Sequence, residues 1–122
     1  MREIKFRAWI TEDRYMGEVT SLQMGDGAYV RTTGETPYCK LYEIELMQYT
    51  GLKDKTGKDG YAGDLVKMFD RSLFRIVWDD YYARFQLELV KGDEFTKVHD
   101  MGMLQFGEII GNIHSNPELL TK

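Results

Sequence analysis

The stretch "YTGLKDKTGKDGYAGDLVKMFD", residues 49–70, places glycines and alternating lysines and aspartates between two more hydrophobic segments. Within it, the segment from Asp54 to Gly57 favours a tight turn. Gly57 can adopt a positive φ without steric cost, and the Asp54 side chain can bond to the backbone that follows it. The first half of the stretch is therefore interpreted as a turn between two strands.

A second bend follows within the same stretch. Gly60 and Gly63 permit the chain to change direction again, and Asp64 can cap the bend where a strand begins. Leu65 and Val66 open that strand. The stretch as a whole predicts a double turn that leads these two apolar residues into a β-sheet.

Two ligand-binding interpretations of the stretch fail on spacing. Asp54, Asp59 and Asp64 offer the hard oxygen ligands that calcium prefers, but an EF-hand loop beginning at Asp54 would place Lys58 at a ligand position and Asp59 at the required glycine. A phosphate-binding loop would need a Gly-Lys-Ser/Thr ending and a following amphipathic helix, and "GLKDKTGKDG" has neither. We assign no metal and no cofactor to this loop or to the rest of the chain.

The N-terminal segment predicts a half-buried strand. Ile4, Phe6, Ala8 and Ile10 alternate with charged residues and Trp9, so they fall on one face of an extended chain. The glycine-rich residues that follow, up to residue 40, are interpreted as small strands or extended loops.

The segment "LYEIELMQYTGL" fits two patterns. Leu41, Ile44 and Met47 have helical spacing, whereas Tyr42, Ile44 and Leu46 alternate as in a strand. The strand is favoured, because the segment enters a glycine turn without a good helix cap.

Alternation resumes after the double turn and predicts a succession of short strands. The expected elements are strands in 64–69 and 74–80, a hairpin over 83–100 with its turn at Gly92 and Asp93, a closing strand in 106–116, and a helical turn over 116–118.

This pattern predicts a mainly β fold in two parts. Residues 1–40 are expected to form an N-terminal β-rich subdomain, and residues 41–122 a small, partly open β-barrel that ends in a short helical turn and can share the first strand. Closure into a barrel would remove exposed sheet edges, which otherwise promote aggregation.

Composition limits the setting of the protein. The 122 residues are 43% hydrophobic and 30% charged, which suits one compact domain or two very small ones. The net charge is −4 with both signs interspersed, which disfavours sequence-independent binding to DNA. Cys39 is the single cysteine, and the N-terminus lacks the apolar core of a signal peptide. We expect a soluble protein in the cytoplasm, without membrane contact.

No group of residues has the spacing that catalysis requires. His99 and His114 could each act as a general base, but neither is placed beside an identifiable nucleophile. Asp79 and Asp80 are adjacent, so on a strand they would point to opposite faces. Cys39 lacks the basic surroundings of a reactive thiolate. We therefore expect a protein that is not an enzyme.

Aromatic and arginine residues gather in one part of the sequence, after residue 74. They could stack unpaired bases, or they could form a core or a subunit interface, where tyrosine and arginine are enriched. The candidate interaction surface consists of Arg75, Trp78, Tyr82 and Arg84.

Three blocks of the chain, "REIKFRAWI", "MQYTGLKDKTGKDGYAGDLVK" and "GEIIGNIHSNPELL", resemble the YopX family of phage and prophage proteins. The resemblance implies a small, mostly β protein in the cytoplasm of a bacterial host cell, encoded by a phage or prophage, and it implies that the partly open barrel expected over residues 41–122 is SH3-like. It implies no activity. "DGYAGDLV" departs from the family pattern "EIYEGDIV" at Gly60 and Ala62, which further weakens a ligand-binding role for the loop. The turn and family-motif residues are Tyr49, Gly51, Leu52, Asp54, Gly57, Gly63 and Asp64.

The sequence thus suggests a non-enzymatic phage or prophage accessory protein that binds another macromolecule, either a phage or a host protein, and that self-associates into a homo-oligomer. The alternative is a single-stranded nucleic-acid-binding protein that uses Arg75, Trp78, Tyr82 and Arg84 on one sheet face.

Overall fold

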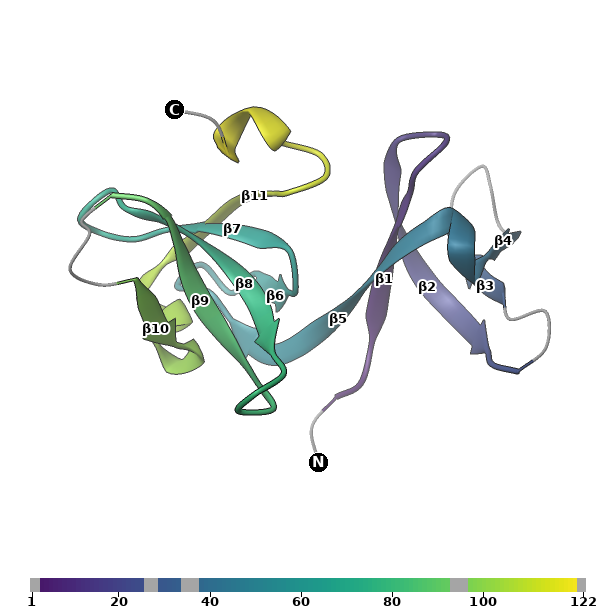
Figure 1. Cartoon of the computed structure of the whole chain (residues 1–122), viewed down its shortest axis with the longest axis horizontal. Helices are drawn as coiled ribbons and strands as arrows, with labels where there is room; N and C mark the ends of the chain where they lie inside the picture. The colour runs from purple at the N-terminus through teal and green to yellow at the C-terminus, as the bar shows by residue number, and fades with distance from the viewer. Residues whose placement is uncertain (1–2, 26–28, 34–37, 93–96, 121–122) are drawn as a thin grey trace. The chain divides into compact units, whose positions relative to one another are not determined.

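The computed structural model describes residues 3–25, 29–33, 38–92 and 97–120 (Figure 1). Three short 3-10 helical segments in these residues are η1 (Leu41–Glu43), η2 (Met101–Phe106) and η3 (Pro117–Leu120). None of the described helical segments is long and apolar enough to cross a membrane. The described strands are β1 (Phe6–Ile10), β2 (Tyr15–Gln23), β3 (Tyr29–Thr32), β4 (Tyr38–Lys40), β5 (Ile44–Lys53), β6 (Asp59–Tyr61), β7 (Asp64–Lys67), β8 (Leu73–Asp79), β9 (Arg84–Lys91), β10 (Val98–Asp100) and β11 (Glu108–Asn112).

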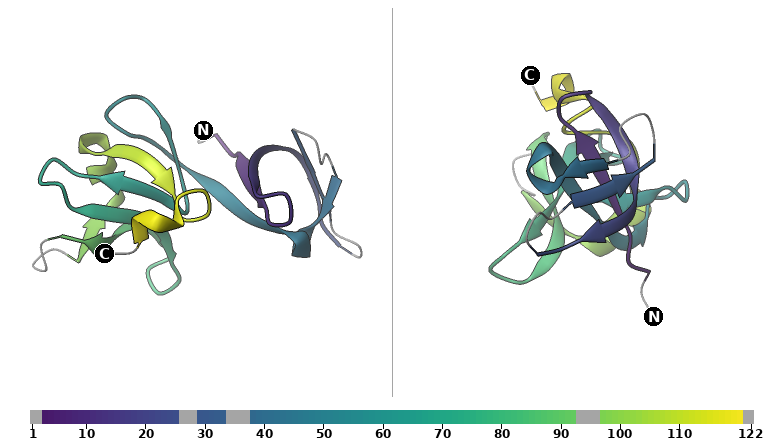
Figure 2. Two further views of the ribbon diagram at one scale, coloured as in Figure 1. Left: turned by 90° about the horizontal axis from the view of Figure 1, so that it is seen from above. Right: turned by 90° about the vertical axis from the view of Figure 1, so that its right-hand side faces the viewer.

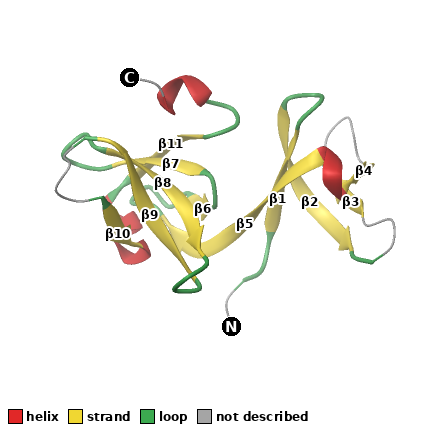
Figure 3. Cartoon of the chain, viewed as in Figure 1, coloured by secondary structure: helices red, strands yellow, loops and turns green. Residues whose placement is uncertain are grey.

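The strands form two antiparallel sheets, and the secondary-structure colouring shows how little helix accompanies them (Figure 3). One sheet has the order β4-β3-β2-β1-β5-β6 and the other the order β10-β9-β8-β7-β11. The mainly β class is therefore confirmed. The described strands form two open sheets and no closed barrel, because β10 and β11 end the second sheet without pairing to each other.

Strand β5 changes its pairing partner in the middle. Its first half pairs with β1 as far as Gln48, opposite Phe6, and its second half pairs with β6 from Tyr49, opposite Tyr61. The chain divides at the same place into two compact units, Glu3–Gln48 and Tyr49–Lys122. The division falls inside a strand, later than the boundary expected after residue 40.

The first unit has a small apolar core of its own. Strand β1 contributes Ala8 and Ile10, while Ile4 precedes the strand and is exposed, so the apolar face is shorter than the sequence pattern suggests. The buried residues of this core are Ala8, Ile10, Val30, Cys39 and Ile44.

The second unit is built around β7, β8 and β9, with η2 packed against the sheet. Leu104 from η2 is fully buried in this core. Gly60 faces it, and a Cβ at this position would lie 2.7 Å from Leu104 Cδ2. Gly60 therefore allows close packing, rather than the positive-φ bend that its place in the double turn suggests. The buried residues of this core are Val66, Met68, Phe74, Ile76, Leu87, Met101, Leu104 and Ile109.

Candidate binding surfaces of the second unit

The first turn of the family motif is organised by the Asp54 carboxylate. Its Oδ1 accepts hydrogen bonds from the Thr56 backbone N–H at 2.9 Å, from the Thr56 hydroxyl at 2.7 Å and from the Lys58 backbone N–H at 2.9 Å. Gly57 closes the turn with φ +89° and donates its N–H to the Asp54 carbonyl. The side chain thus holds the turn from inside.

The other oxygen of Asp54 ties this turn to a distant strand. Oδ2 accepts the backbone N–H of Ile109 in β11 at 2.8 Å, and Lys55 N–H donates to the Gly107 carbonyl beside it at 3.0 Å. Burial raises the pKa of Asp54, but the hydrogen bonds from Ile109, Thr56 and Lys58 outweigh it and hold this pKa below its ordinary value. Both carboxylate oxygens therefore serve backbone donors, which makes Asp54 an anchor of the fold.

The second bend is organised by Asp64, whose Oδ2 accepts the Tyr61 backbone N–H at 2.8 Å. Gly63 adopts φ +93° and donates its N–H to the Ile76 carbonyl at 2.8 Å. Asp64 itself is buried at the start of β7. This bend attaches the entry of β7 to β8.

The remaining motif residues lie in β5. Tyr49 is buried and its ring lies 5.6 Å from that of Tyr61, centroid to centroid. Gly51 adopts φ +90° where the β5–β6 register shifts, and Leu52 is exposed. These residues shape the strand that precedes the double turn.

The predicted interaction residues do not share one sheet face. Arg75 and Trp78 are three positions apart on β8, so they point to opposite faces. Arg75 is also paired, since its Nη2 lies 2.5 Å from Glu88 Oε1 on β9. Trp78 packs edge-on against Phe85, with ring centroids 4.9 Å apart. Arg75 is therefore not available as part of an aromatic surface with Trp78.

The end of the β8–β9 hairpin does collect the other predicted residues. We call Trp78, Tyr81, Tyr82 and Arg84 the hairpin tip; Figures 1 and 2 show this hairpin projecting from the sheet of the second unit. Trp78 is 49% exposed, Tyr81 86% and Tyr82 62%. The Arg84 guanidinium lies 4.9 Å from the centre of the Tyr82 ring, and the Tyr81 and Tyr82 rings meet edge to face. The tip thus presents a preassembled aromatic and cationic group.

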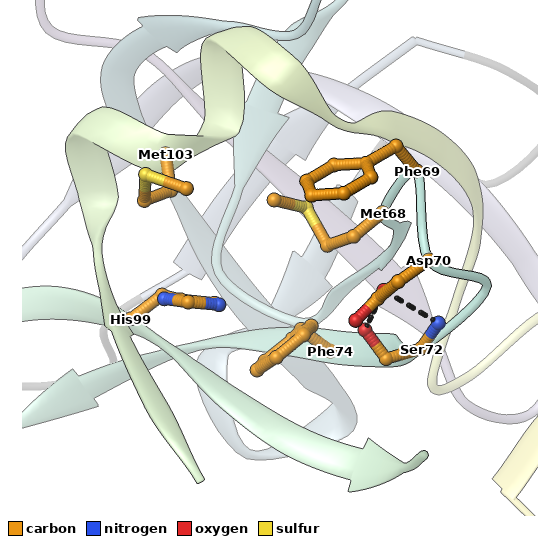
Figure 4. A pocket seen from close by; sticks show the side chains of 7 residues that line it. All are labelled: Met68, Phe69, Asp70, Ser72, Phe74, His99 and Met103. Carbon is orange, nitrogen blue, oxygen red and sulfur yellow. Dashed lines mark hydrogen bonds between the residues drawn. The ribbon is translucent and has the colours of Figure 1, made fainter. Parts of the chain in front are cut away.

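A cavity of about 180 Å³ opens at the other end of the same sheet (Figure 4). Its walls come from the β7–β8 turn, β8, β10 and η2, and His99 from β10 lies with its ring 4.8 Å from that of Phe74. The lining residues are Met68, Phe69, Asp70, Ser72, Phe74, His99 and Met103. Its apolar walls thus surround two groups capable of hydrogen bonding, one from His99 and one from Asp70.

Asp70 and Ser72 form a tight turn at the rim of this cavity. Asp70 Oδ1 accepts the Ser72 backbone N–H at 3.0 Å and also the Ser72 hydroxyl, as the dashed lines in Figure 4 show. These bonds lower the pKa of Asp70, and the nearby His99 adds a smaller electrostatic effect. The hydroxyl of the buried Ser72 donates to Asp70 and not to His99. Ser72 and His99 therefore lack the serine–histidine hydrogen bond of a hydrolase.

A second cavity, of about 270 Å³, adjoins the β7–β8 turn and is lined in part by it. It shares Met68 and Phe69 with the first cavity. Three cationic side chains and one carboxylate line it, namely Lys55, Lys67, Arg71 and Glu108. The positive local charge contrasts with the net charge of −4 of the whole chain.

The sequence patterns missed these two cavities, although one local signal exists. Phe69 is followed in sequence by the polar turn residues Asp70, Arg71 and Ser72. An aromatic residue beside such a turn is expected to be exposed unless the turn packs against the core. Phe69 is 83% exposed here. The other lining residues come from separate elements, and nothing in their spacing brings them together.

The two remaining candidates from the sequence lie elsewhere. His114 belongs to the turn after β11, where its backbone N–H donates to Asn112 Oδ1 at 3.0 Å, and it lines neither cavity. Cys39 is buried in the core of the first unit, and burial, followed by the charges of Glu43 and Asp13, raises the pKa of its thiol. A thiol in this position is a poor nucleophile.

The described strands form two open antiparallel sheets, and the chain passes from one sheet to the other in the double turn. This architecture defines a small, mainly β protein. The family model described as YopX protein matches residues 5–121, and the chain belongs to this family. Among solved structures, the crystal structure of protein EF1440 from Enterococcus faecalis is similar, with 27% sequence identity and a TM-score of 0.65. The match covers 99% of this chain and 100% of that one. No curated protein matches the chain.

Proposed function

We propose that this chain is a non-enzymatic accessory protein of a phage or prophage, which acts in the bacterial cytoplasm by binding another protein through the hairpin tip. The observation that carries this proposal is the exposure of Trp78, Tyr81 and Tyr82 on one projecting hairpin. Single aromatic residues at a protein surface are common, whereas several exposed aromatic residues gathered on one element mark an interaction site.

The chemistry of the tip favours a protein partner. Tryptophan, tyrosine and arginine are the residues that most often dominate the binding energy of protein interfaces. The mutual contacts of Tyr81, Tyr82 and Arg84 restrain these side chains before binding, so less conformational entropy is lost when a partner is bound. The Asp79 carboxylate supports the tip by accepting the Tyr81 backbone N–H at 2.9 Å.

A test compares three forms of the chain as bait in lysates of phage-infected bacteria. The forms are the natural chain, a Tyr81→Ser/Tyr82→Ser variant, and a Tyr42→Ser control, since Tyr42 is 83% exposed in the first unit. We expect one protein to be captured by the natural chain and the control, and to bind the tip variant at least tenfold more weakly when purified. Equal binding to the tip variant would contradict the proposal.

Self-association is the second part of the proposal. Strands β10 and β11 end the second sheet, and strand edges can pair with another copy of the chain. Light scattering over a concentration series should show a dimer or larger species for the natural chain. A monomer at every concentration would contradict self-association. It would not bear on the binding of a different protein, which the capture experiment tests.

The alternative function is binding of single-stranded nucleic acid at the same tip. The observation in its favour is the Arg84–Tyr82 contact, because bases stack on aromatic rings beside arginine. Against it stand the pairing of Arg75 with Glu88 and the acidic net charge of the chain. Fluorescence anisotropy with a labelled oligothymidylate at 50 and 200 mM salt tests it, and the Tyr81→Ser/Tyr82→Ser variant must lose any affinity.

A further inference from the structure

The β7–β8 turn presents an exposed phenylalanine between two cavities of different chemistry. Phe69 is 83% exposed and lines both cavities. Met68 and Ser72 on either side are buried, and Met68 N–H donates to the Ser72 carbonyl at 3.0 Å. The exposed ring is therefore held on a turn that is itself fixed to the core.

The first cavity fits a planar ring with polar edges. Met68, Phe74 and Met103 supply apolar walls, and a cavity of about 150 Å³ is enough to hold one benzene molecule, compared with about 180 Å³ here. Asp70 adds a hydrogen-bond acceptor. Within the described part of the chain the His99 ring makes no hydrogen bond, so its nitrogens can donate to or accept from a ligand.

The second cavity fits an anionic group. Lys55, Lys67 and Arg71 line it together with Glu108, and no ion pair joins Glu108 to any of these cations within the described residues. Lys55 is held in place by its backbone bond to the Gly107 carbonyl, and Lys67 by the pairing of β7 with β11. A phosphate group bound here would accept hydrogen bonds from the charged side chains of Lys55, Lys67 and Arg71. Such charge-assisted hydrogen bonds are stronger than those between neutral groups.

We propose that the two cavities together bind a nucleotide, with the base in the cavity lined by His99 and Phe74 and the phosphate in the cavity lined by Lys55, Lys67 and Arg71. The Phe69 ring lies between them and covers the sugar or stacks on a neighbouring base. This site is separate from the hairpin tip and does not depend on the protein-binding proposal.

The combination of groups favours a nucleotide over an acidic peptide. A peptide carboxylate would fill the cationic cavity, but an apolar peptide side chain in the other cavity would make no hydrogen bond with the His99 ring, and would leave Asp70 with only its two bonds from Ser72. The edge of a nucleobase offers both donors and acceptors to such groups. The base can come from a free mononucleotide or from a single strand, which the experiment separates.

The experiment uses the full chain labelled with ¹⁵N, titrated in separate samples with AMP, UMP, an oligothymidylate of eight nucleotides and polyglutamate. We expect saturable shifts of the backbone signals of Lys55, Lys67, Phe69, Arg71 and His99 with at least one nucleotide probe. Shifts with the mononucleotides alone indicate a free nucleotide as ligand, and tighter binding of the oligonucleotide indicates a single strand. Equal or tighter binding of polyglutamate at these residues, or no shift with any nucleotide, would overturn the proposal.

Variants distinguish this site from general charge attraction. Phe69→Ala should weaken binding of the best probe by about tenfold, because a stacking surface is lost. Lys55→Ala/Lys67→Ala should weaken it as well, whereas Lys5→Ala/Lys97→Ala, with the same loss of charge, should not. For the oligonucleotide, three phosphate contacts predict a slope of about −2 for log K against log salt. Unchanged affinity of Phe69→Ala would also overturn the proposal, and Tyr42→Ser, which alters an equally exposed aromatic residue of the first unit, serves as the control that keeps full affinity.

Discussion

Asp54 and Ile109 are 55 positions apart in the chain, and the Asp54 carboxylate accepts the Ile109 backbone N–H at 2.8 Å. The same carboxylate organises the turn that holds Thr56 and Lys58. One buried side chain therefore connects the first turn of the family motif to the last strand of the sheet. This connection gives the loop of the family motif a structural task that does not require a ligand.

Asp54→Asn should destabilise the protein by about 2 kcal/mol or more, because hydrogen bonds to a charged acceptor contribute about 1.5–3 kcal/mol each. An amide group also turns an N–H toward one of the backbone donors that the carboxylate now accepts. Urea unfolding followed by fluorescence measures the effect. The control is Asp59→Asn, which removes one charge of the partly exposed ion pair with Lys53 and should cost less than about 1 kcal/mol. Equal losses in the two variants would contradict the anchoring role.

The stability should fall in acid in a way that depends on Asp54. Its pKa is lower in the folded chain than its ordinary value, so the unfolded state binds a proton first as the pH falls. The stabilisation is complete above the ordinary carboxyl pKa and is lost as the pH falls through the folded pKa. Urea unfolding between pH 7 and pH 3 should therefore show the difference between the natural chain and Asp54→Asn shrinking toward pH 3. A constant difference would refute this assignment.

Ala83→Gly should stabilise the protein by about 0.5–1 kcal/mol. Ala83 adopts φ +51° in the β8–β9 turn, a left-handed conformation that is costly for residues with a Cβ and free of steric cost for glycine. Ala62→Gly is the matched control, since Ala62 is not among the residues with positive φ and should lose stability through added chain entropy. Thermal unfolding of the two variants should shift in opposite directions.

Gly60→Ala should destabilise the second unit by about 1–3 kcal/mol, as expected for overpacking. The added Cβ would lie 2.7 Å from Leu104 Cδ2 and 3.2 Å from the Leu52 carbonyl oxygen, and Leu104 is fully buried. Gly102→Ala, where a Cβ meets nothing within 4 Å, is the control and should change stability little. A Gly60→Ala chain as stable as the control would show that Leu104 can move away.

The mainly β class could be predicted because alternation and glycine turns are local properties. The turn at Gly57, with its φ of +89°, has the same local origin. The bond from Asp54 to Ile109 could not be predicted, since no pattern near Asp54 records a partner in β11. The division between Gln48 and Tyr49 was equally hidden, because β5 continues through it and only its pairing partner changes.

The candidate surfaces show the same limit. The aromatic residues of the hairpin tip are near one another in sequence, so their gathering was visible, but strand alternation separates Arg75 from Trp78. The two cavities around Phe69 combine residues from the β5–β6 turn, β7, β10, η2 and β11. Such a site depends on the three-dimensional pairing of strands, which periodicity does not specify.

The burial of Cys39 gives the chain a natural reporter of motion in its first unit. It is the single cysteine of the chain and belongs to the core formed with Ala8, Val30 and Ile44. A thiol reagent can reach it only when that core opens, so the rate of labelling measures the opening of this unit alone. Compared with unfolding followed by the fluorescence of Trp78 in a Trp9→Phe variant, which leaves tryptophan in the second unit alone, this rate would reveal whether the two units open together or in turn.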